Sequence, residues 1–350
     1  MSNIKEHQTM NYDTQMLSSS EEDIEKAAAL LREGKVVGIP TETVYGLAAD
    51  ALNSTAVSEI FKAKGRPQDN PLIVHIGEFS DIYKYVTEVP ENADKLAKAF
   101  WPGPLTMVLP KRDIIPMTTS GGLDTVGIRF PVHPVAREII RRSGTALAAP
   151  SANLSGSPSP TTAMHVYNDM NGRISAIVDG GDCAVGVEST VVSFDKDGRV
   201  RLLRPGFVSL EDIKGIVGEG NAVCAKGVTE KISDGEKVLS PGMKYKHYSP
   251  KANVTILCGT IEQFTKYVSA HNGDRVCSMI FDSDANGFPF KYITYGDTSE
   301  KQARELFAVL RSLDDMGAEQ VYARCPEQTG VGLAVYNRLL RAAGFEVVNL

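Results

Sequence analysis

Hydrophobic and polar positions along the chain fall into blocks that predict helices and strands in alternation. A Ser20–Asp23 capping pattern precedes apolar residues at helical spacing, and Gly34 follows them, so a helix is predicted over residues 20–34. An apolar strand is predicted at 36–40. Strand and helix patterns then alternate, with irregular proline-rich connections, as far as residue 206. This part of the chain is therefore predicted to be α/β.

The pattern becomes more regular after residue 250. Over residues 299–316 the apolar side chains recur at helical spacing, namely Ala303, Leu306, Leu310, Leu313 and Met316. Strands are also predicted at 254–257, 276–281 and 320–323, and helices from 261 and over 333–343. This alternation predicts a small doubly wound parallel sheet. Because no Gly-x-Gly-x-x-Gly string follows its first strand, no dinucleotide site is predicted there.

Two polar strings carry the candidate chemistry. Residues 64–67 place Lys64 and Arg66 on a turn that proline stiffens and where glycine permits close approach of a ligand. Arginine can bind phosphate oxygens with two N–H groups, and lysine adds a point charge. Residues 151–156 follow an apolar run at 145–150, at the kind of strand end where α/β sheets bind ligands. The strings predict a phosphate site, with a solvated basic turn and a plain turn plus helix cap as the simpler alternatives.

Three more segments are interpreted as an apolar strand with a polar tip. Strand 36–40 leads into 41–47, strand 126–128 leads into 129–131, and the polar residues of 186–190 adjoin an apolar pair at 191–192. A single site is usually built from several strand ends and loops, so these segments are predicted to share one cleft.

Longer strings extend this pattern, in a fixed order, over residues 20–250. They are Pro40-Thr41-Glu42-Thr43-Val44-Tyr45-Gly46-Leu47, Lys62-Ala63-Lys64-Gly65-Arg66-Pro67, Asn70-Pro71-Leu72, Phe100-Trp101-Pro102-Gly103-Pro104-Leu105-Thr106, Arg129-Phe130-Pro131, Ala149-Pro150-Ser151-Ala152-Asn153, Glu188-Ser189-Thr190-Val191, Arg204-Pro205-Gly206 and Ser240-Pro241-Gly242-Met243-Lys244-Tyr245-Lys246-His247-Tyr248. With these strings the chain resembles the threonylcarbamoyl-AMP synthase family, the YrdC-like family in its long form. The resemblance implies an α/β fold with a twisted open mixed sheet and helices around a large cleft, plus a small Rossmann-like doubly wound C-terminal domain.

Three regions are expected on this basis: a YrdC-like catalytic domain at 18–210, a linking or gating segment at 211–250, and the Rossmann-like domain at 251–350. The linking segment contains Tyr245, His247 and Tyr248. A plain tether is usually Gly/Ser-rich and does not need aromatic rings. We therefore expect this segment to close over the nucleotide.

The resemblance also implies roles for individual residues. The expected ATP-binding residues are Lys64, Arg66, Asn70, Thr125, Ser151, Asn153, Ser159, Arg204, Tyr245 and Tyr248, with Lys64 and Arg66 as the candidate catalytic cations. The expected threonine-binding residues are Thr43, His75, Arg129, Ala149 and Ser189. Arg129 suits the carboxylate of the amino acid because its guanidinium is a planar fork. For His75 the alternative is an ordinary hydrogen-bonded histidine at a strand.

The implied reaction condenses L-threonine, bicarbonate or CO₂, and ATP into threonylcarbamoyl-AMP and pyrophosphate. Such a transfer needs positioning and charge neutralisation more than covalent catalysis. Mg²⁺ is expected to accompany ATP on phosphate oxygens and water, and no residue is named as a metal ligand. A separate tRNA threonylcarbamoyl-transferase complex would use the product next to the anticodon of tRNAs that read codons beginning with A. Direct tRNA binding is possible but not required.

Composition limits the other classes of function. The net charge of -6 argues against general nucleic-acid binding, and no apolar run is long enough to span a membrane. Five scattered cysteines without Cys-x-x-Cys spacing, and no signal-peptide pattern, predict a cytoplasmic protein without structural zinc. Two alternatives stay open. One is an RNA-binding module that uses Lys62, Lys64, Arg66, Lys111, Arg112, Arg141 and Arg142. The other is a carbamoyl-adenylate-forming enzyme, which usually carries acylphosphatase-like and zinc-finger regions that this sequence lacks.

Overall fold

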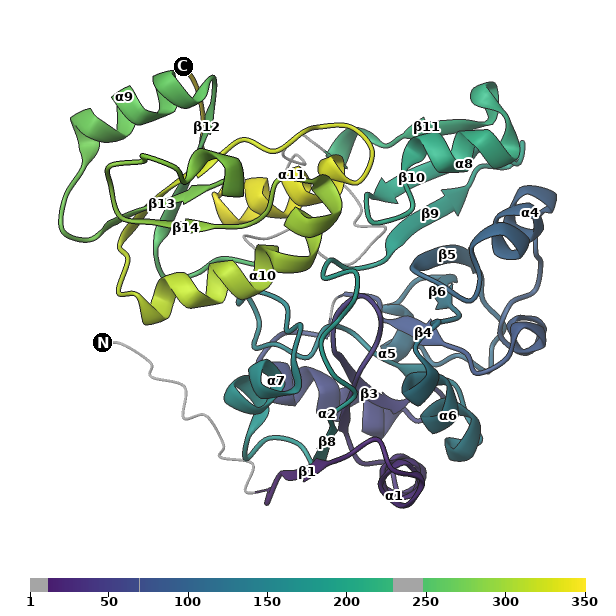
Figure 1. Cartoon of the computed structure of the whole chain (residues 1–350). Coiled ribbons are helices and arrows are strands. Elements are labelled where there is room, and N and C mark those ends of the chain that lie inside the picture. The colour runs from purple at the N-terminus through teal and green to yellow at the C-terminus, as the bar shows by residue number, and fades with distance from the viewer. Residues whose placement is uncertain (1–11, 69, 229–247) are drawn as a thin grey trace, which may run out of the picture.

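The computed structural model describes residues 12–68, 70–228 and 248–350. Within them the strands form two sheets, one large and mixed, the other small and parallel (Figure 1). The strand order of the large sheet is β1-β8-β2-β3-β7-β4-β6-β5-β9-β10-β11. Its strands are β1 (Gln15–Leu17), β2 (Val37–Ile39), β3 (Gly46–Asp50), β4 (Ile73–His75), β5 (Leu105–Pro110), β6 (Thr125–Arg129), β7 (Leu147–Ala148), β8 (Ala176–Val178), β9 (Thr190–Phe194), β10 (Val200–Arg204) and β11 (Ala222–Cys224).

Helices cover the large sheet on both faces. They are α1 (Glu21–Arg32), α2 (Ser54–Lys64), α3 (Ile82–Tyr85), α4 (Glu91–Phe100), α5 (Met117–Ser120), α6 (Pro134–Ser143), α7 (Ala163–Met170) and α8 (Leu210–Val217), with 3₁₀ turns η1 (Phe79–Asp81), η2 (Glu219–Asn221) and η3 (Lys226–Val228). The N-cap of α1 is Ser20, whose side chain accepts from the Asp23 amide, as the capping pattern predicts. Helices α1 and α6 pack on one face, while α2, α4, α7 and α8 contribute to the larger core on the other.

The small sheet is built from parallel strands in the order β14-β13-β15-β12-β16. Its strands are β12 (Asn253–Cys258), β13 (Val276–Ile280), β14 (Tyr292–Thr294), β15 (Gln320–Arg324) and β16 (Val347–Asn349), and η4 spans Asp282–Asp284. Helix α9 (Ile261–His271) packs on one face, whereas α10 (Ser299–Asp315) and α11 (Gly332–Ala342) pack on the other. Helices on both faces of a parallel sheet make it doubly wound, so the expected fold class is confirmed.

The two sheets share a hydrophobic core. Val44, Val185 and Val187, which belong to the first part of the chain, lie in the same cluster as α10, α11 and Tyr248. Gly186 lies so close to α10 that an added Cβ would be 2.4 Å from the Cα of Arg304. No side chain fits there, so the backbone of this loop packs directly on the helix.

The predicted linking segment begins with regular structure. Helix α8 begins at Leu210 after the cap residue Ser209, and β11 pairs with β10 at the edge of the large sheet. The part of the segment that contains Tyr245 lies outside the described residues, so the predicted gate stays a prediction. Among the described helices, none is both long and apolar enough to cross a bilayer.

Candidate active site

One pocket gathers most of the residues expected to bind ligands. It spans about 710 Å³, including space open to solvent, and it is lined by Thr43, Lys64, Arg66, His75, Arg129, Ala149, Ser151, Asn153, Ser189, Arg204 and Tyr248. On β4 and β6, His75 and Arg129 are register partners and alternate with the core residues Val74 and Ile128. Side chains of successive strand residues point to opposite faces, so the pocket lies on the face of the sheet away from the main core.

Lys64 is buried inside the wall of the pocket. It is the last residue of α2, which Gly65 ends in a left-handed conformation. Its ammonium donates to the carbonyl oxygens of Ser151 and Asn153, the latter at 2.8 Å, and to Asn153 Oδ1 at 3.4 Å. Burial, and then the charge of Arg66, lowers the pKa of Lys64 well below its ordinary value. Loop carbonyls therefore hold the Lys64 ammonium at the lining of the pocket, and its expected roles in ATP binding and catalysis stay predictions.

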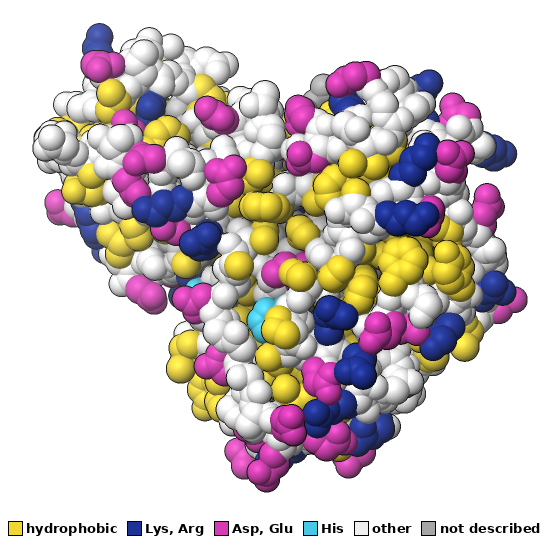
Figure 2. All heavy atoms as spheres, turned by 45° about the vertical axis from the view of Figure 1, so that its right-hand side comes forward, with side chains coloured by type: hydrophobic (Ala, Val, Ile, Leu, Met, Phe, Trp, Pro, Cys, Tyr) yellow, Lys and Arg dark blue, Asp and Glu magenta, His cyan; other side chains and the backbone are white. Residues whose placement is uncertain are grey.

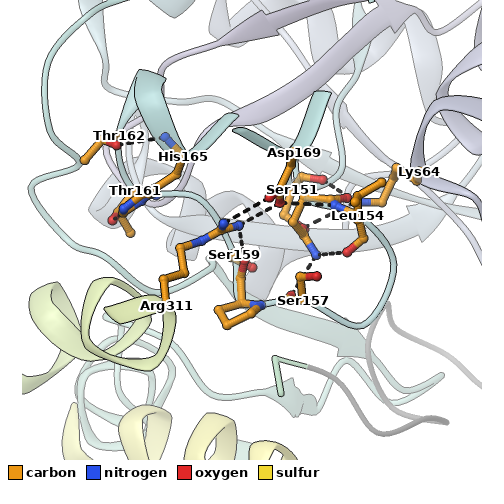
Figure 3. Close-up of polar contacts among 12 residues, drawn as sticks. Lys64, Ser151, Leu154, Ser157, Ser159, Thr161, Thr162, His165, Asp169 and Arg311 are labelled. Atoms are coloured by element: carbon orange, nitrogen blue, oxygen red, sulfur yellow. Dashed lines mark hydrogen bonds and ion pairs between the residues drawn. The ribbon is translucent and has the colours of Figure 1, made fainter. Parts of the chain in front are cut away.

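The loop that Lys64 holds is fixed from the other side by α10. Arg311 donates to both carboxylate oxygens of Asp169, at 2.7 and 3.1 Å, and to the carbonyl oxygen of Pro158 at 2.6 Å (Figure 3). Asp169 in turn accepts from the backbone amide of Leu154 at 3.3 Å. The 151–159 loop is thus held between a lysine of α2 and an arginine of α10.

Arg66 lies beyond the turn and is partly exposed at the pocket. Its guanidinium stacks over the ring of Phe61, 5.2 Å from the centroid. Such stacking fixes the orientation of the planar guanidinium at the pocket. Both cations of the first polar string therefore line the pocket, and Arg66 is the more exposed of the two.

The expected threonine side contains a buried ion pair. Arg129 Nη2 lies 2.6 Å from Glu42 Oε1, and both side chains are buried. Among the described residues, Arg129 Nε has no hydrogen-bond partner, so part of its donor set is unused within the fold. Burial, and then the charge of Arg129, lowers the pKa of His75 to about 3, so its imidazole is neutral at pH 7. The His75 Nδ1 atom lies 3.3 Å from the carbonyl oxygen of Ile73.

Ser189 and Arg204 form a second hydrogen-bonded unit. Arg204 donates to the Ser189 carbonyl oxygen at 3.0 and 3.1 Å and to its hydroxyl at 3.2 Å, and Thr106 lies 2.8 Å from the same hydroxyl. Burial lowers the pKa of Arg204 to about 10, which leaves it charged at pH 7. The polar residues 186–189 precede strand β9, so the expected order of strand and then tip is wrong at this segment.

Of the expected residues that the structure describes, three are not in the lining of this pocket. Thr125 lines a smaller adjoining hollow, Asn70 is buried just before β4, and Tyr245 lies outside the described residues. Ser159 donates its hydroxyl to Glu188 Oε1 at 2.6 Å and so supports the wall from behind. Their expected roles in ATP binding stay predictions.

Sequence reasoning missed Glu188 as a pocket residue. Its carboxylate lines the pocket and accepts from Arg338, 150 positions away on α11. Glu188 lies in the string at 188–191, but no local pattern in the sequence shows which arginine it pairs with. The apolar lining from Pro71, Leu72 and Ile73 was missed as well, although Asn70-Pro71-Leu72 was among the matching strings.

The described residues provide no protein cage for a metal ion. None of them forms a group of three or more His, Cys, Asp or Glu side chains that could hold one. Glu188 lines the pocket and Glu42 does not, and both pair with arginines; the other polar lining groups are mostly cations, hydroxyls and an amide. This donor set suits an anion that brings its own Mg²⁺ better than a metal bound by protein alone.

Comparison with known proteins decides the family. Residues 29–206 match the family model described as "Telomere recombination", and residues 208–344 match the one described as "Threonylcarbamoyl-AMP synthase, C-terminal domain". The chain is 44% identical over 336 residues to the threonylcarbamoyl-AMP synthase of Pyrococcus abyssi, covering 93% of this chain and 95% of that protein. It is 46% identical over 341 residues to the enzyme of that name from Bacillus subtilis, covering 96% and 97%. The chain belongs to the threonylcarbamoyl-AMP synthase family.

A solved structure of this synthase family has the same overall fold. The P. abyssi protein Sua5 complexed with L-threonine superimposes with a TM-score of 0.89 at 42% identity, covering 96% of this chain and 100% of that chain. The resemblance that the sequence strings suggested is confirmed, and the likeness extends through the C-terminal sheet. The overall arrangement of the two sheets is thus common to this chain and that protein.

Proposed function

We propose that this chain condenses L-threonine, bicarbonate or CO₂, and ATP to L-threonylcarbamoyl-AMP, with release of pyrophosphate. The observation that carries the proposal is a pocket that places Lys64, Arg66, Arg129 and Arg204 around one space, in a chain similar over nearly its whole length to threonylcarbamoyl-AMP synthases. Four basic residues around one pocket suit a triphosphate and an amino-acid carboxylate.

The proposed chemistry takes place in two bond-forming steps. The amine of threonine adds to CO₂ and loses a proton, which gives a carbamate. A carbamate oxygen then attacks the α-phosphorus of ATP, forming a P–O bond while the bond to pyrophosphate breaks. Arg66 binds phosphate oxygens and Arg129 binds the threonine carboxylate. The hydroxyl of Thr43 lies 2.9 Å from that of Thr41, which donates to the carbonyl oxygen of Val44; Thr43 therefore donates to Thr41 and keeps acceptor capacity for the ligand.

Mg²⁺ belongs to the proposal as the companion of ATP. It would be held by phosphate oxygens and water and would neutralise charge on the departing pyrophosphate. The unstable product would be passed to a separate transferase complex that modifies tRNA. Direct binding of tRNA by this chain is not required for either step.

The RNA-binding alternative has weak physical support. Lys62, Arg141 and Arg142 pair with nearby carboxylates, and Arg112 donates to the carbonyl oxygens of Tyr83 and Val86. On the face shown in Figure 2, basic and acidic side chains are interspersed and do not form one basic surface. Nothing in the described residues favours the carbamoyl-adenylate alternative over the synthase.

The test is pyrophosphate release by the purified chain with threonine, bicarbonate and ATP omitted in turn. We expect release only when all three are present. Arg66→Ala is expected to lower the rate about a hundredfold or more, as loss of a charged contact to a transferring phosphoryl group does. Lys62→Ala is the matched control, because that side chain lies on the outer face of α2 and pairs with Glu59. Equal release without threonine would refute the proposal.

A further inference from the structure

The C-terminal sheet reaches the pocket wall through a buried arginine. Arg338 lies on α11, is fully buried, and places its Nε 2.9 Å from Oε2 of Glu188. Its terminal nitrogens donate to the carbonyl oxygen of Pro205 and to that of Glu188, the latter at 3.4 Å. Pro205 follows Arg204, and Glu188 precedes Ser189. One side chain therefore ties together the two segments that carry this pair of pocket residues.

Glu188 is the acidic member of the pocket wall. It is the only carboxylate among the described lining residues. A negative charge there opposes the binding of a triphosphate, because like charges repel strongly where water is excluded. Burial alone would raise the pKa of Glu188, but the charges of Arg338 and Arg204 and the Ser159 hydroxyl together lower it. The carboxylate is therefore ionised at pH 7, and a neighbouring cation has to offset its charge.

We propose that Arg338 is a positioning residue for nucleotide binding, which acts by neutralising Glu188 in the pocket wall. The inference rests on the proposed function, since it takes ATP as the anion that the pocket binds. In this proposal the C-terminal part of the chain contributes a positive charge to the site through Arg338. That side chain does not line the pocket but pairs with Glu188, which does. The pocket is then composite, with its charge set by two distant parts of the chain.

The test measures Mg·ATP binding to the full chain by calorimetry, and the ATP dependence of pyrophosphate release. Arg338→Met removes the charge and keeps much of the apolar volume. We expect the Kd and KM for ATP to rise about tenfold or more, because the Glu188 carboxylate is left buried without its ion-pair partner. We expect kcat at saturating ATP to stay within about threefold, since Arg338 does not touch the reacting atoms. Arg304→Met is the control: it removes another hydrogen bond between the sheets, to the Ala184 carbonyl oxygen, at a residue that does not line the pocket.

The double variant Arg338→Met with Glu188→Gln separates charge from packing. It removes both charges and keeps an oxygen that can accept from Ser159, so the Kd for ATP should return to within about threefold of wild type. The inference would be overturned if the double variant bound ATP as weakly as Arg338→Met. It would also be overturned if Arg338→Met bound ATP with the same Kd as wild type. If Arg338→Met does not fold, Arg338→Lys takes its place: it retains the charge, and a tenfold loss of affinity in that variant also overturns it. Wild type that binds ATP but releases no pyrophosphate would refute the proposed function, while the ratios of Kd would still test Arg338.

Discussion

Replacing Lys64, the last residue of α2, by methionine tests whether this side chain stabilises the loop that forms the pocket wall or only contacts a bound ligand. Methionine keeps the apolar stem but leaves the carbonyl oxygens of Ser151 and Asn153 without their charged donor. An unsatisfied buried acceptor costs about 1–3 kcal/mol, so two of them cost about 2–6 kcal/mol. Relief of the buried ammonium offsets part of this, because burial already lowers the Lys64 pKa. We expect a loss of about 2–4 kcal/mol in the free energy of unfolding.

The assay uses the protein's own fluorescence. Trp101 is the single tryptophan of the sequence, and it is buried in the same core cluster as Ala63, the neighbour of Lys64. Urea unfolding followed at Trp101 therefore reports on the large sheet. Lys62→Met is the control, since its side chain is 61% exposed and pairs only with Glu59 among the described residues. Equal unfolding free energies for the Lys64→Met and Lys62→Met variants would refute the reasoning.

Three further predictions concern pH, packing and selectivity. The pKa of His75 is about 3 in the folded chain and about 6.5 in the unfolded chain, so the unfolded state takes up the proton first as the pH falls. The free energy of unfolding therefore decreases below pH 6.5, and the loss due to His75 is roughly 2 kcal/mol at pH 5. In the His75→Gln variant, the free energy of unfolding in urea should change between pH 7 and pH 5 by that amount less than in wild type. An equal change in the two proteins would contradict this prediction. Gly186→Ala should lower stability by about 2 kcal/mol or more, since its Cβ meets the α10 backbone, whereas Gly181→Ala, also at positive φ but in open space, should cost less; equal melting temperatures would contradict this. In pyrophosphate release, serine should replace threonine with a loss of about 1–3 kcal/mol in kcat/KM and valine should be rejected more strongly, because valine leaves hydroxyl partners unpaired; better release with valine would contradict the threonine assignment.

Elements with clear periodicity could be predicted from the sequence. The helix expected over 299–316 is α10 (Ser299–Asp315), and the strand expected at 254–257 lies inside β12. In both cases the signal is local, since the spacing of apolar residues and the cap residue lie within the element. The β1 strand was not predicted, because its three residues are held only by pairing with β8, more than 150 positions later.

The candidate site shows the same division between local and distant information. The strings at 64–67 and 151–156 correctly predicted loops that line the pocket. Turns and strand ends can be predicted in this way because their signals lie in adjacent residues. Which loop atoms Lys64 would meet could not be predicted, since its partners lie 87 and 89 positions away. The pairing of Glu188 with Arg338 was hidden for the same reason: it depends on how α11 packs against the large sheet.

The shared core has a consequence for how the chain is made. Val44, Val185 and Val187 are translated early, but the side chains of α10 and α11 that cover them are translated more than 100 residues later. During synthesis the first part of the chain therefore leaves the ribosome before the helices that cover its apolar surface have been made. Helices α10 and α11 can cover this surface only after they have been synthesised. A nascent chain that stalls before residue 299 should be a substrate for proteases and holdases, even though every residue of its first sheet has been made.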